Sequence, residues 1–265
     1  MYKAKNKDIP RIMDFISSEP EMNLFTIGDI EAFGLESDKC QVFLYEENER
    51  IKSTILLYHS YLTLYFNEFD FDLAPVAEKI NQLIKNGATV LSGKMEVMDA
   101  IQGHLNGKIK SVSRDYFAKC EHLNKLDMVS YDKVQYAGVD HAQEIVELFD
   151  SIPEFKGNTP VDVMKQALLD GSRKTTIVKI KNKICSTASL TAETKNSGMI
   201  IGVATHPKGD HRRKGFASAC VSKLVDDLNK SGKTACLFYD NPEAGSIYKK
   251  IGFKDIGFWV MVRFE

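Results

Sequence analysis

The spacing of apolar positions predicts strands that alternate with helices in the C-terminal half of the chain. Apolar runs typical of strands cover residues 133–137, 175–180, 184–191, 199–205, 234–239 and 257–264. Apolar residues at helical spacing predict helices over residues 142–151, 160–170, 215–230 and 244–251. This alternation favours an α/β fold in which helices cover the faces of a mixed sheet.

The N-terminal half shows a faint repeat of the same plan. The run Ile51-Lys-Ser-Thr-Ile-Leu-Leu57 is similar to Ile184-Cys-Ser-Thr-Ala-Ser-Leu190, and each follows a short apolar strand and a charged turn. Asp8 lies 43 residues before Ile51, and Asp140 lies 44 residues before Ile184. Matching order and spacing favour a duplicated fold over two unrelated β-hairpins with similar turns. We therefore predict two domains, residues 1–127 and 128–265, with their boundary in a polar stretch.

One turn in the C-terminal half is suited to binding a pyrophosphate. The predicted strand 199–205 is followed by a basic turn with a glycine near its end, and the helix 215–230 begins there. Backbone N–H groups at a helix N-terminus are unpaired, and the helix dipole adds partial positive charge. Gly215 lets the backbone approach the phosphates, and Arg212, Arg213 and Lys214 supply full charges.

The corresponding segment of the N-terminal half lacks this chemistry. Residues 67–72 contain three carboxylates and neither a glycine nor a basic residue. Because like charges repel, this loop is unsuited to a pyrophosphate. We expect the N-terminal half to be a degenerate copy that binds no cofactor, packs on the active half and closes one wall of the substrate cleft.

Two motifs in the C-terminal half resemble those of one enzyme superfamily. Arg212-x-x-Gly215-x-Ala217 is similar to the coenzyme signature of the GCN5-related N-acetyltransferases (GNAT), with a longer loop before Arg212. The segment from Asn241 through Tyr248 to Gly252-Phe253 is similar to the second hallmark of this superfamily. The resemblance covers residues 133–265. It implies tandem GNAT-like mixed sheets flanked by helices, in which only the C-terminal half keeps an intact acetyl-CoA site.

The resemblance implies transfer of the acetyl group of acetyl-CoA to a primary amine of a small molecule or protein, by direct attack in a ternary complex. Tyr248 is the expected proton donor to the coenzyme A thiolate, with packing beside Phe253 as the alternative. Asn241 is expected to bind the pantetheine arm, to cap a helix, or both. Glu193 is a candidate general base, although a solvated turn residue is the alternative. The full expected cofactor-binding set is Val203, Ala204, Thr205, His211, Arg212, Arg213, Lys214, Gly215, Phe216, Ala217, Ser218, Asn241 and Tyr248.

Strand 199–205 is expected to supply the N–H donor for the thioester oxygen, through a bulge that Gly202 makes easy. The alternative is an ordinary buried strand. Two other functions stay open: a non-catalytic module that binds acetyl-CoA as a signal, and an aminoacyl transferase of the paired-GNAT type. The retained Tyr248 argues against the first, and the intact pyrophosphate turn argues against the second.

Composition excludes several partners. The net charge of −1 gives no case for nucleic acid or an anionic membrane. The five scattered cysteines contain no CxxC pair, so we expect no metal site and no disulfide framework, as in a cytoplasmic protein. No apolar run approaches the length of a membrane span, and the N-terminus lacks a signal-peptide core. A monomer or a homodimer is expected.

Overall fold

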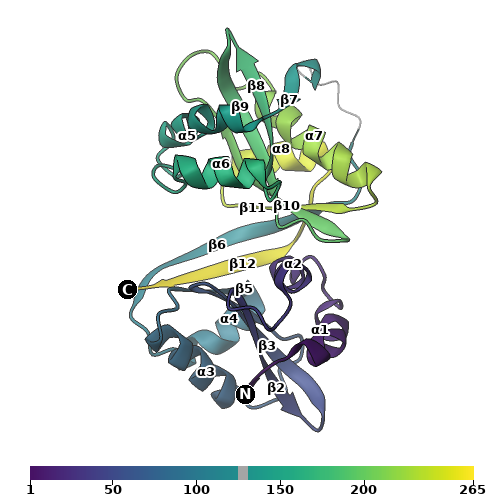
Figure 1. Cartoon of the computed structure of the whole chain (residues 1–265), viewed down its shortest axis with the longest axis vertical. Helices are drawn as coiled ribbons and strands as arrows, with labels where there is room; N and C mark the ends of the chain where they lie inside the picture. The colour runs from purple at the N-terminus through teal and green to yellow at the C-terminus, as the bar shows by residue number, and fades with distance from the viewer. Residues whose placement is uncertain (125–130) are drawn as a thin grey trace. The chain divides into compact units, whose positions relative to one another are not determined.

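The computed structural model describes residues 1–124 and 131–265, and these residues form two compact units (Figure 1). The first unit comprises Met1–Phe117 with Ile256–Glu265, and the second comprises Ala118–Asp255. The boundary predicted between residues 127 and 128 lies outside the described residues and stays a prediction.

The first unit is a mixed sheet with a pair of helices on each face. Its strands are β1 (Tyr2–Lys3), β2 (Cys40–Glu47), β3 (Arg50–Tyr58), β4 (Tyr61–Tyr65), β5 (Val90–Lys94) and β6 (Ile109–Cys120). Its helices are η1 (Asn6–Asp8), α1 (Ile9–Ile16), α2 (Leu24–Phe33), α3 (Ala74–Lys85), α4 (Met95–Ile101) and η2 (Gln102–His104). The first four strands pair antiparallel in chain order, and β4 pairs parallel with β5. One apolar cluster lies under α1 and α2, and a second lies under α3 and α4.

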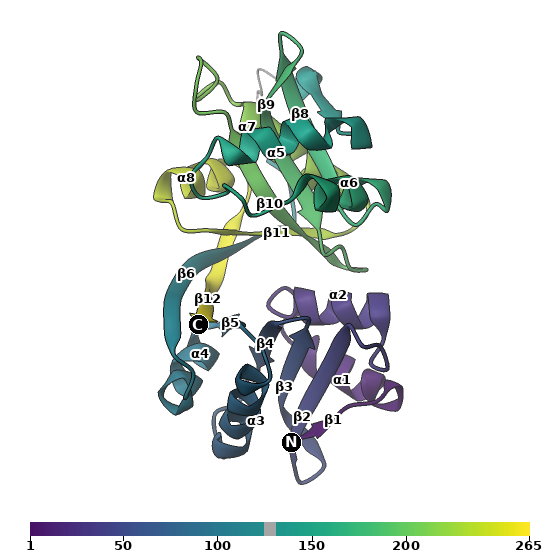
Figure 2. The same cartoon turned by 60° about the vertical axis from the view of Figure 1, so that its left-hand side comes forward.

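The second unit repeats this order of elements. Its strands are β7 (Val134–Tyr136), β8 (Lys174–Ile180), β9 (Lys183–Thr191), β10 (Ser197–Thr205) and β11 (Thr234–Tyr239), followed by β12 (Lys254–Phe264). Its helices are η3 (Tyr131–Lys133), η4 (Val139–His141), α5 (Ala142–Asp150), α6 (Val161–Leu169), α7 (Phe216–Lys230) and α8 (Pro242–Ile251). Helices α5 and α6 share an apolar cluster with one face of the sheet, and α7 covers the other face (Figure 2). The helices and strands predicted from the spacing of apolar residues are present.

The two similar sequence runs form equivalent hairpins, which confirms the internal repeat. Both turns place two residues at positive φ: Asn48 and Glu49 in the first, Lys181 and Asn182 in the second. Positive φ at both central residues matches the twist of a two-residue hairpin turn. A register shift lies at the same place in each hairpin, just before the turn, between Tyr45 and Glu46 and between Val178 and Lys179. Ile51 and Ile184 therefore occupy equivalent positions.

A second equivalence lies at the first helical turn of each half. The N–H of Lys5 donates to Asp8 Oδ2 at 2.9 Å, and the N–H of Gly138 donates to His141 Nδ1 at 3.0 Å. The structural counterpart of Asp8 is therefore His141, one residue after the Asp140 that the sequence comparison favoured.

The last strand pairs away from the sheet that precedes it in the chain. β12 pairs antiparallel with β5 of the first unit, from Trp259 opposite Lys94 to Arg263 opposite Val90. Conversely, the end of β6 from Ala118 belongs to the second unit, where β6 neighbours β11. Each unit thus contains strand residues from the other half of the sequence.

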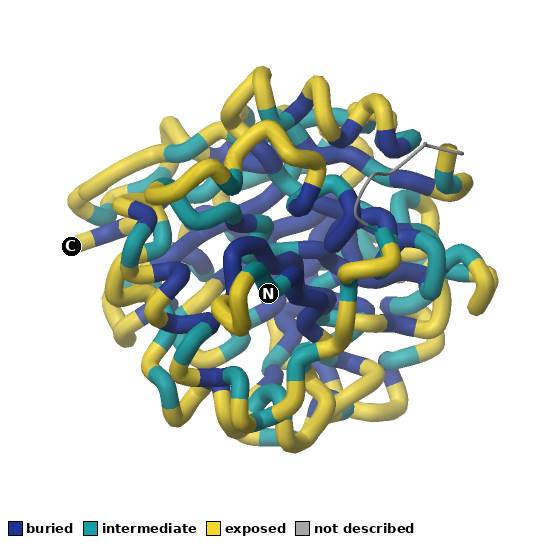
Figure 3. Tube along the Cα trace, turned by 90° about the horizontal axis from the view of Figure 1, so that it is seen from above, coloured by how far each residue is buried: buried dark blue, intermediate teal, exposed yellow. Residues whose placement is uncertain are grey.

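Buried residues follow the strands and the inner faces of the helices, whereas turns and loops are exposed (Figure 3). All five cysteines are buried. Within the described ranges, no helix combines the length and the apolar character that a bilayer span requires. The same residues contain no cluster of three His, Cys, Asp or Glu side chains suited to a metal ion.

Candidate functional site

Strands β10 and β11 separate at their C-terminal ends. Their parallel pairing runs from Ser197 opposite Thr234 to Ile200 opposite Leu237, although β10 continues to Thr205. On its other edge β10 pairs with β9, and that register shifts between Ile201 and Ala204. The shift leaves Gly202 and Val203 outside the ladder, so their backbone groups are available to a ligand. The bulge predicted at Gly202 is confirmed.

Gly202 is required by this bulge. Its φ is +59°, and a Cβ atom at this position would lie 2.9 Å from Cζ of the buried Phe149. A side chain would therefore face both a strained backbone and a steric overlap.

We expect Gly202→Ala to lower the free energy of unfolding by about 2–3 kcal/mol, because backbone strain and overpacking add. Gly171→Ala is the matched control, since Gly171 has a φ of +74° and open space around its Cβ position. Strain alone should cost the control about 1 kcal/mol. Urea denaturation of both variants measures the difference, and equal losses would contradict the overlap with Phe149.

Helix α7 begins with an open N-terminus. Gly215 is its N-cap in the left-handed conformation, with a φ of +77°, and no side chain caps the helix. The first intrahelical bond runs from the N–H of Ala219 to the carbonyl of Gly215 at 2.9 Å. The N–H groups of Phe216, Ala217 and Ser218 therefore lack intrahelical acceptors. A Cβ atom at Gly215 would meet nothing within 4 Å, so space remains in front of these donors.

Positive charge gathers at this helix start. Arg212 and Arg213 are exposed, and within residues 1–124 and 131–265 neither guanidinium has an acidic partner. Lys214 forms an ion pair with Asp210 at 2.9 Å. His211 is half-buried. Free N–H groups, the helix dipole and two unpaired guanidinium groups fit a diphosphate.

Tyr248 lies on α8 with its ring among other aromatic side chains. Its exposed fraction is 7%, and its ring centroid lies 5.7 Å from Tyr239 and 5.9 Å from Phe253. Burial raises the pKa of Tyr248 to about 12, because the phenolate would lose its hydration. The hydroxyl therefore keeps its proton at neutral pH and is chemically able to donate it. The packing predicted beside Phe253 is also present.

Asn241 caps α8, as the alternative interpretation of this residue predicted. Its Oδ1 accepts the N–H of Glu243 at 2.8 Å, and the side chain is exposed. Capping uses only the amide oxygen, so the two N–H bonds of the side-chain amide stay available to a ligand.

Glu193 is not brought to the separated strand ends. Ser189 is the partner of Ile201, and Glu193 lies beyond the end of β9 at Thr191, in the turn that leads to the start of β10 at Ser197. Its carboxylate accepts from Lys174 Nζ at 2.6 Å and from Lys233 Nζ at 2.7 Å. Burial alone raises the pKa of Glu193, but these two hydrogen bonds outweigh it and hold the pKa below its usual value. A carboxylate stabilised in this way is a weak base.

A pocket that the sequence analysis missed adjoins the turn before α7. It is an open pocket of about 620 Å³, lined by Ile180, Lys181, Lys183, Asp210, His211, Lys214 and Phe216. The lysines of the β8–β9 turn lie 30 residues before the basic turn, so local spacing gave no reason to join them. One signal was present in the sequence: the equivalent turn of the first half, between β2 and β3, is rich in glutamate, whereas the β8–β9 turn is rich in lysine.

At the equivalent place in the first unit, the start of α3 offers fewer free N–H groups. Asp72 Oδ1 accepts the N–H of Ala74, the first residue of α3, at 2.9 Å, and Pro75 has no N–H. Glu68 and Asp70 are held by Lys52 at 2.6 and 3.4 Å. A carboxylate thus occupies the position where a coenzyme phosphate would need donors, which supports the interpretation of a degenerate copy.

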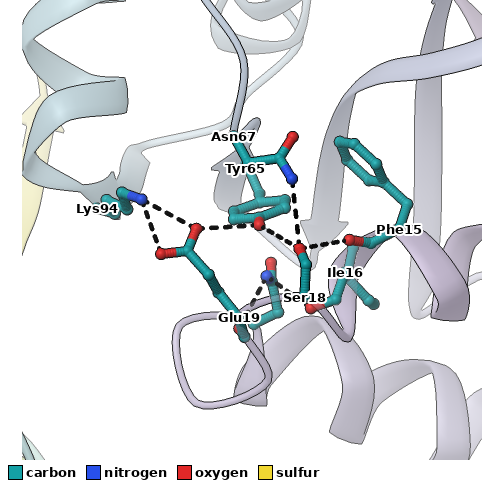
Figure 4. A network of polar contacts seen from close by, with 8 residues as sticks. Phe15, Ile16, Ser18, Glu19, Tyr65, Asn67 and Lys94 are labelled. Atoms are coloured by element: carbon teal, nitrogen blue, oxygen red, sulfur yellow. Dashed lines mark hydrogen bonds and ion pairs between the residues drawn. The ribbon is translucent and has the colours of Figure 1, made fainter.

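A polar network links the ends of β4 and β5 in the first unit (Figure 4). Glu19 accepts from Lys94 Nζ at 2.8 Å and from the hydroxyl of Tyr65 at 3.0 Å. Ser18 bonds the same hydroxyl at 3.0 Å, and Asn67 Nδ2 donates to Ser18 at 3.4 Å. Side chains therefore tie together the strand ends that correspond to the separated ends of β10 and β11.

We expect Glu19→Gln to lower the free energy of unfolding by about 1–2 kcal/mol, since the half-buried ammonium of Lys94 loses its counter-charge. Arg11→Gln is the control, because it breaks the more exposed ion pair with Glu46 and should cost less than about 1 kcal/mol. Thermal and urea unfolding measure both. Identical stabilities would show that the network contributes nothing beyond a surface ion pair.

Residues 175–261 match the family model described as GNAT acetyltransferase. A comparison with curated proteins gives no match.

Solved structures of similar fold extend over the whole chain. A GCN5-related N-acetyltransferase-like protein from Streptococcus suis is 13% identical and has a TM-score of 0.63, with 99% of this chain and 100% of that chain covered. A tandem GNAT protein from the clavulanic acid biosynthesis pathway is 10% identical, with a TM-score of 0.60 and coverage of 98% and 96%. An acetyltransferase of the GNAT family from Colwellia psychrerythraea is 14% identical, with a TM-score of 0.56 and coverage of 96% and 97%. Residues 175–261 are thus similar to the GNAT acetyltransferase family, and the whole chain has the fold of a tandem GNAT protein.

Proposed function

We propose that the chain is an N-acetyltransferase that transfers the acetyl group of acetyl-CoA to a primary amine of a small molecule or protein. The open N-terminus of α7 at Gly215, beside the separated end of β10, is the observation that carries the proposal. The activity is assigned to the C-terminal half, residues 128–265, and residues 1–127 are assigned no coenzyme.

The second unit offers donors along the length of a coenzyme A molecule. The N–H groups of residues 216–218 and the guanidinium groups of Arg212 and Arg213 would hold the diphosphate. The free backbone of β10 from Val203 to Thr205 would pair with the amides of the pantetheine arm, and Asn241 would donate from its side-chain amide. Bound acetyl-CoA supplies the thioester whose acetyl group is transferred.

The remaining roles concern charge and protons at the reacting carbonyl. The N–H of Val203 in the bulge is assigned to stabilise negative charge on the carbonyl oxygen, because it is free of the ladder with β9. The protonated hydroxyl of Tyr248 is assigned to donate to the departing thiolate. Because Glu193 is ion-paired with Lys174 and Lys233, we assign the removal of the amine proton to water, or we infer an amine that arrives already neutral.

Calorimetric titration with acetyl-CoA, followed by thiol release in the presence of a panel of primary amines, tests the proposal. Acetyl-CoA should bind with one site per chain, and at least one amine should accelerate thiol release. Absence of binding would overturn the proposed site. Binding without turnover on any amine would favour a non-catalytic acetyl-CoA-binding module.

A further inference from the structure

We propose that the pocket between the β8–β9 turn and the loop before α7 holds the 3′-phosphate at the adenosine end of coenzyme A, with Lys181 and Lys183 as its ligands. This inference rests on the proposed function. It extends that function to a part of the coenzyme remote from the thioester, and it assigns a specificity for the 3′-phosphate.

The pocket is in the right place for that end of the molecule. Lys214 and Phe216 line it, and these residues flank Gly215, where the diphosphate is proposed to bind. In coenzyme A the diphosphate joins the pantetheine arm on one side and the ribose with its 3′-phosphate on the other. If the arm follows β10, the adenosine end leaves on the opposite side. A cavity of about 620 Å³ is within the usual range of about 300–1,000 Å³ for small-molecule sites.

The pocket carries positive charge that the protein does not neutralise. Asp210 is paired with Lys214 at 2.9 Å, so these two lining residues cancel. Lys181 and Lys183 are exposed, and neither ammonium has a carboxylate partner among the described residues. Two adjacent unpaired ammonium groups are suited to a phosphate dianion. Ile180 and Phe216 add apolar surface beside them, which suits a nucleoside.

The equivalent hairpin of the first unit is an internal comparison. Aligned on the shared turn, Glu46, Glu47, Glu49 and Arg50 occupy the positions of Lys179, Ile180, Asn182 and Lys183. The remaining position is Asn48 in the first unit and Lys181 in the second. Over these five positions the first unit has three glutamates and one arginine, whereas the second unit has three lysines. The turn is acidic where the neighbouring helix start is blocked by Asp72, and basic where the helix start is open. This correlation indicates that the turn and the helix start serve one anionic ligand.

Calorimetric titration of the full chain with coenzyme A and with dephospho-coenzyme A tests the inference. The wild-type chain should bind coenzyme A about tenfold more tightly, as expected for charge-assisted contacts to one phosphate. Lys181→Asn combined with Lys183→Gln should remove this preference and leave the affinity for dephospho-coenzyme A within about twofold of wild type. Asn suits the positive φ at position 181, so the turn should keep its conformation.

Arg50→Gln is the control in the other hairpin, because Arg50 occupies the position of Lys183 and its replacement removes one positive charge, as Lys183→Gln does. It should keep the tenfold preference. A double variant that weakens both ligands equally, or a wild-type chain that binds both equally, would overturn the inference while leaving the proposed function intact. A wild-type chain that binds neither ligand would overturn the proposed function as well.

Inorganic phosphate distinguishes the coenzyme from a free anion as the source of the phosphate. At millimolar phosphate the preference for coenzyme A over dephospho-coenzyme A should shrink only modestly, because a tethered phosphate has a high effective concentration. Lysine-dependent binding of inorganic phosphate alone, without any preference between the two coenzymes, would show that the pocket serves a free anion and would overturn the assignment.

Discussion

Gly215→Glu is expected to abolish detectable binding of acetyl-CoA, with an affinity at least about a hundredfold lower than that of the wild type, which corresponds to about 2.8 kcal/mol. Two effects add. The new carboxylate would stand in the open space before the free N–H groups of α7, where it repels phosphate by about 1–4 kcal/mol at 4 Å, depending on the local dielectric constant. The φ of +77° also strains any residue with a Cβ atom, which disturbs the donors themselves.

Gly232→Glu provides a matched control at the opposite end of the same helix. Gly232 has a φ of +70° and open space around its Cβ position, so the substitution adds the same charge and a similar strain. Its affinity for acetyl-CoA, measured by calorimetry, should stay within about threefold of wild type, because the charge lies outside a Debye length of about 8 Å. Gly215→Ala separates strain from charge and should lose less affinity than Gly215→Glu. Wild-type binding by Gly215→Glu would show that the coenzyme is held elsewhere.

Tyr248→Phe is expected to lower kcat by about ten- to a hundredfold while the dissociation constant of acetyl-CoA stays within about twofold. The loss lies at the low end for a general acid, since a thiol with a pKa of about 8.5 already leaves readily. Removal of the hydroxyl keeps the ring contacts with Tyr239 and Phe253, and the described structure gives that hydroxyl no hydrogen bond to lose. Stability should therefore change by less than about 0.5 kcal/mol.

Tyr239→Phe separates catalysis from packing in the same aromatic group. The hydroxyl of Tyr239 donates to Asp255 at 2.6 Å, so its removal should cost about 1 kcal/mol of stability with little change in kcat. Saturation kinetics and calorimetry on the two variants give both constants. Unchanged turnover in Tyr248→Phe would leave this residue with a packing role only.

Much of the site follows from short stretches of sequence. The order of strands and helices depends on the period of apolar residues, and each period is visible within one element. The turn from His211 to Ala217 is equally local, because a glycine at positive φ and the first free N–H groups of a helix are adjacent in the chain. The repeat was visible because two hairpins with the same turn conformation need similar residues at the same spacing.

Tertiary structure decided what depends on residues far apart in the chain. The pattern of β12 marks a strand but does not specify its partner, since any exposed sheet edge offers the same backbone donors and acceptors, and here it pairs with β5. The two lysines that hold Glu193 come from β8 and from the residue before β11, so sequence spacing could not reveal that this carboxylate is already paired. The basic pocket likewise joins a hairpin turn to a helix start, and only folding brings these two segments together.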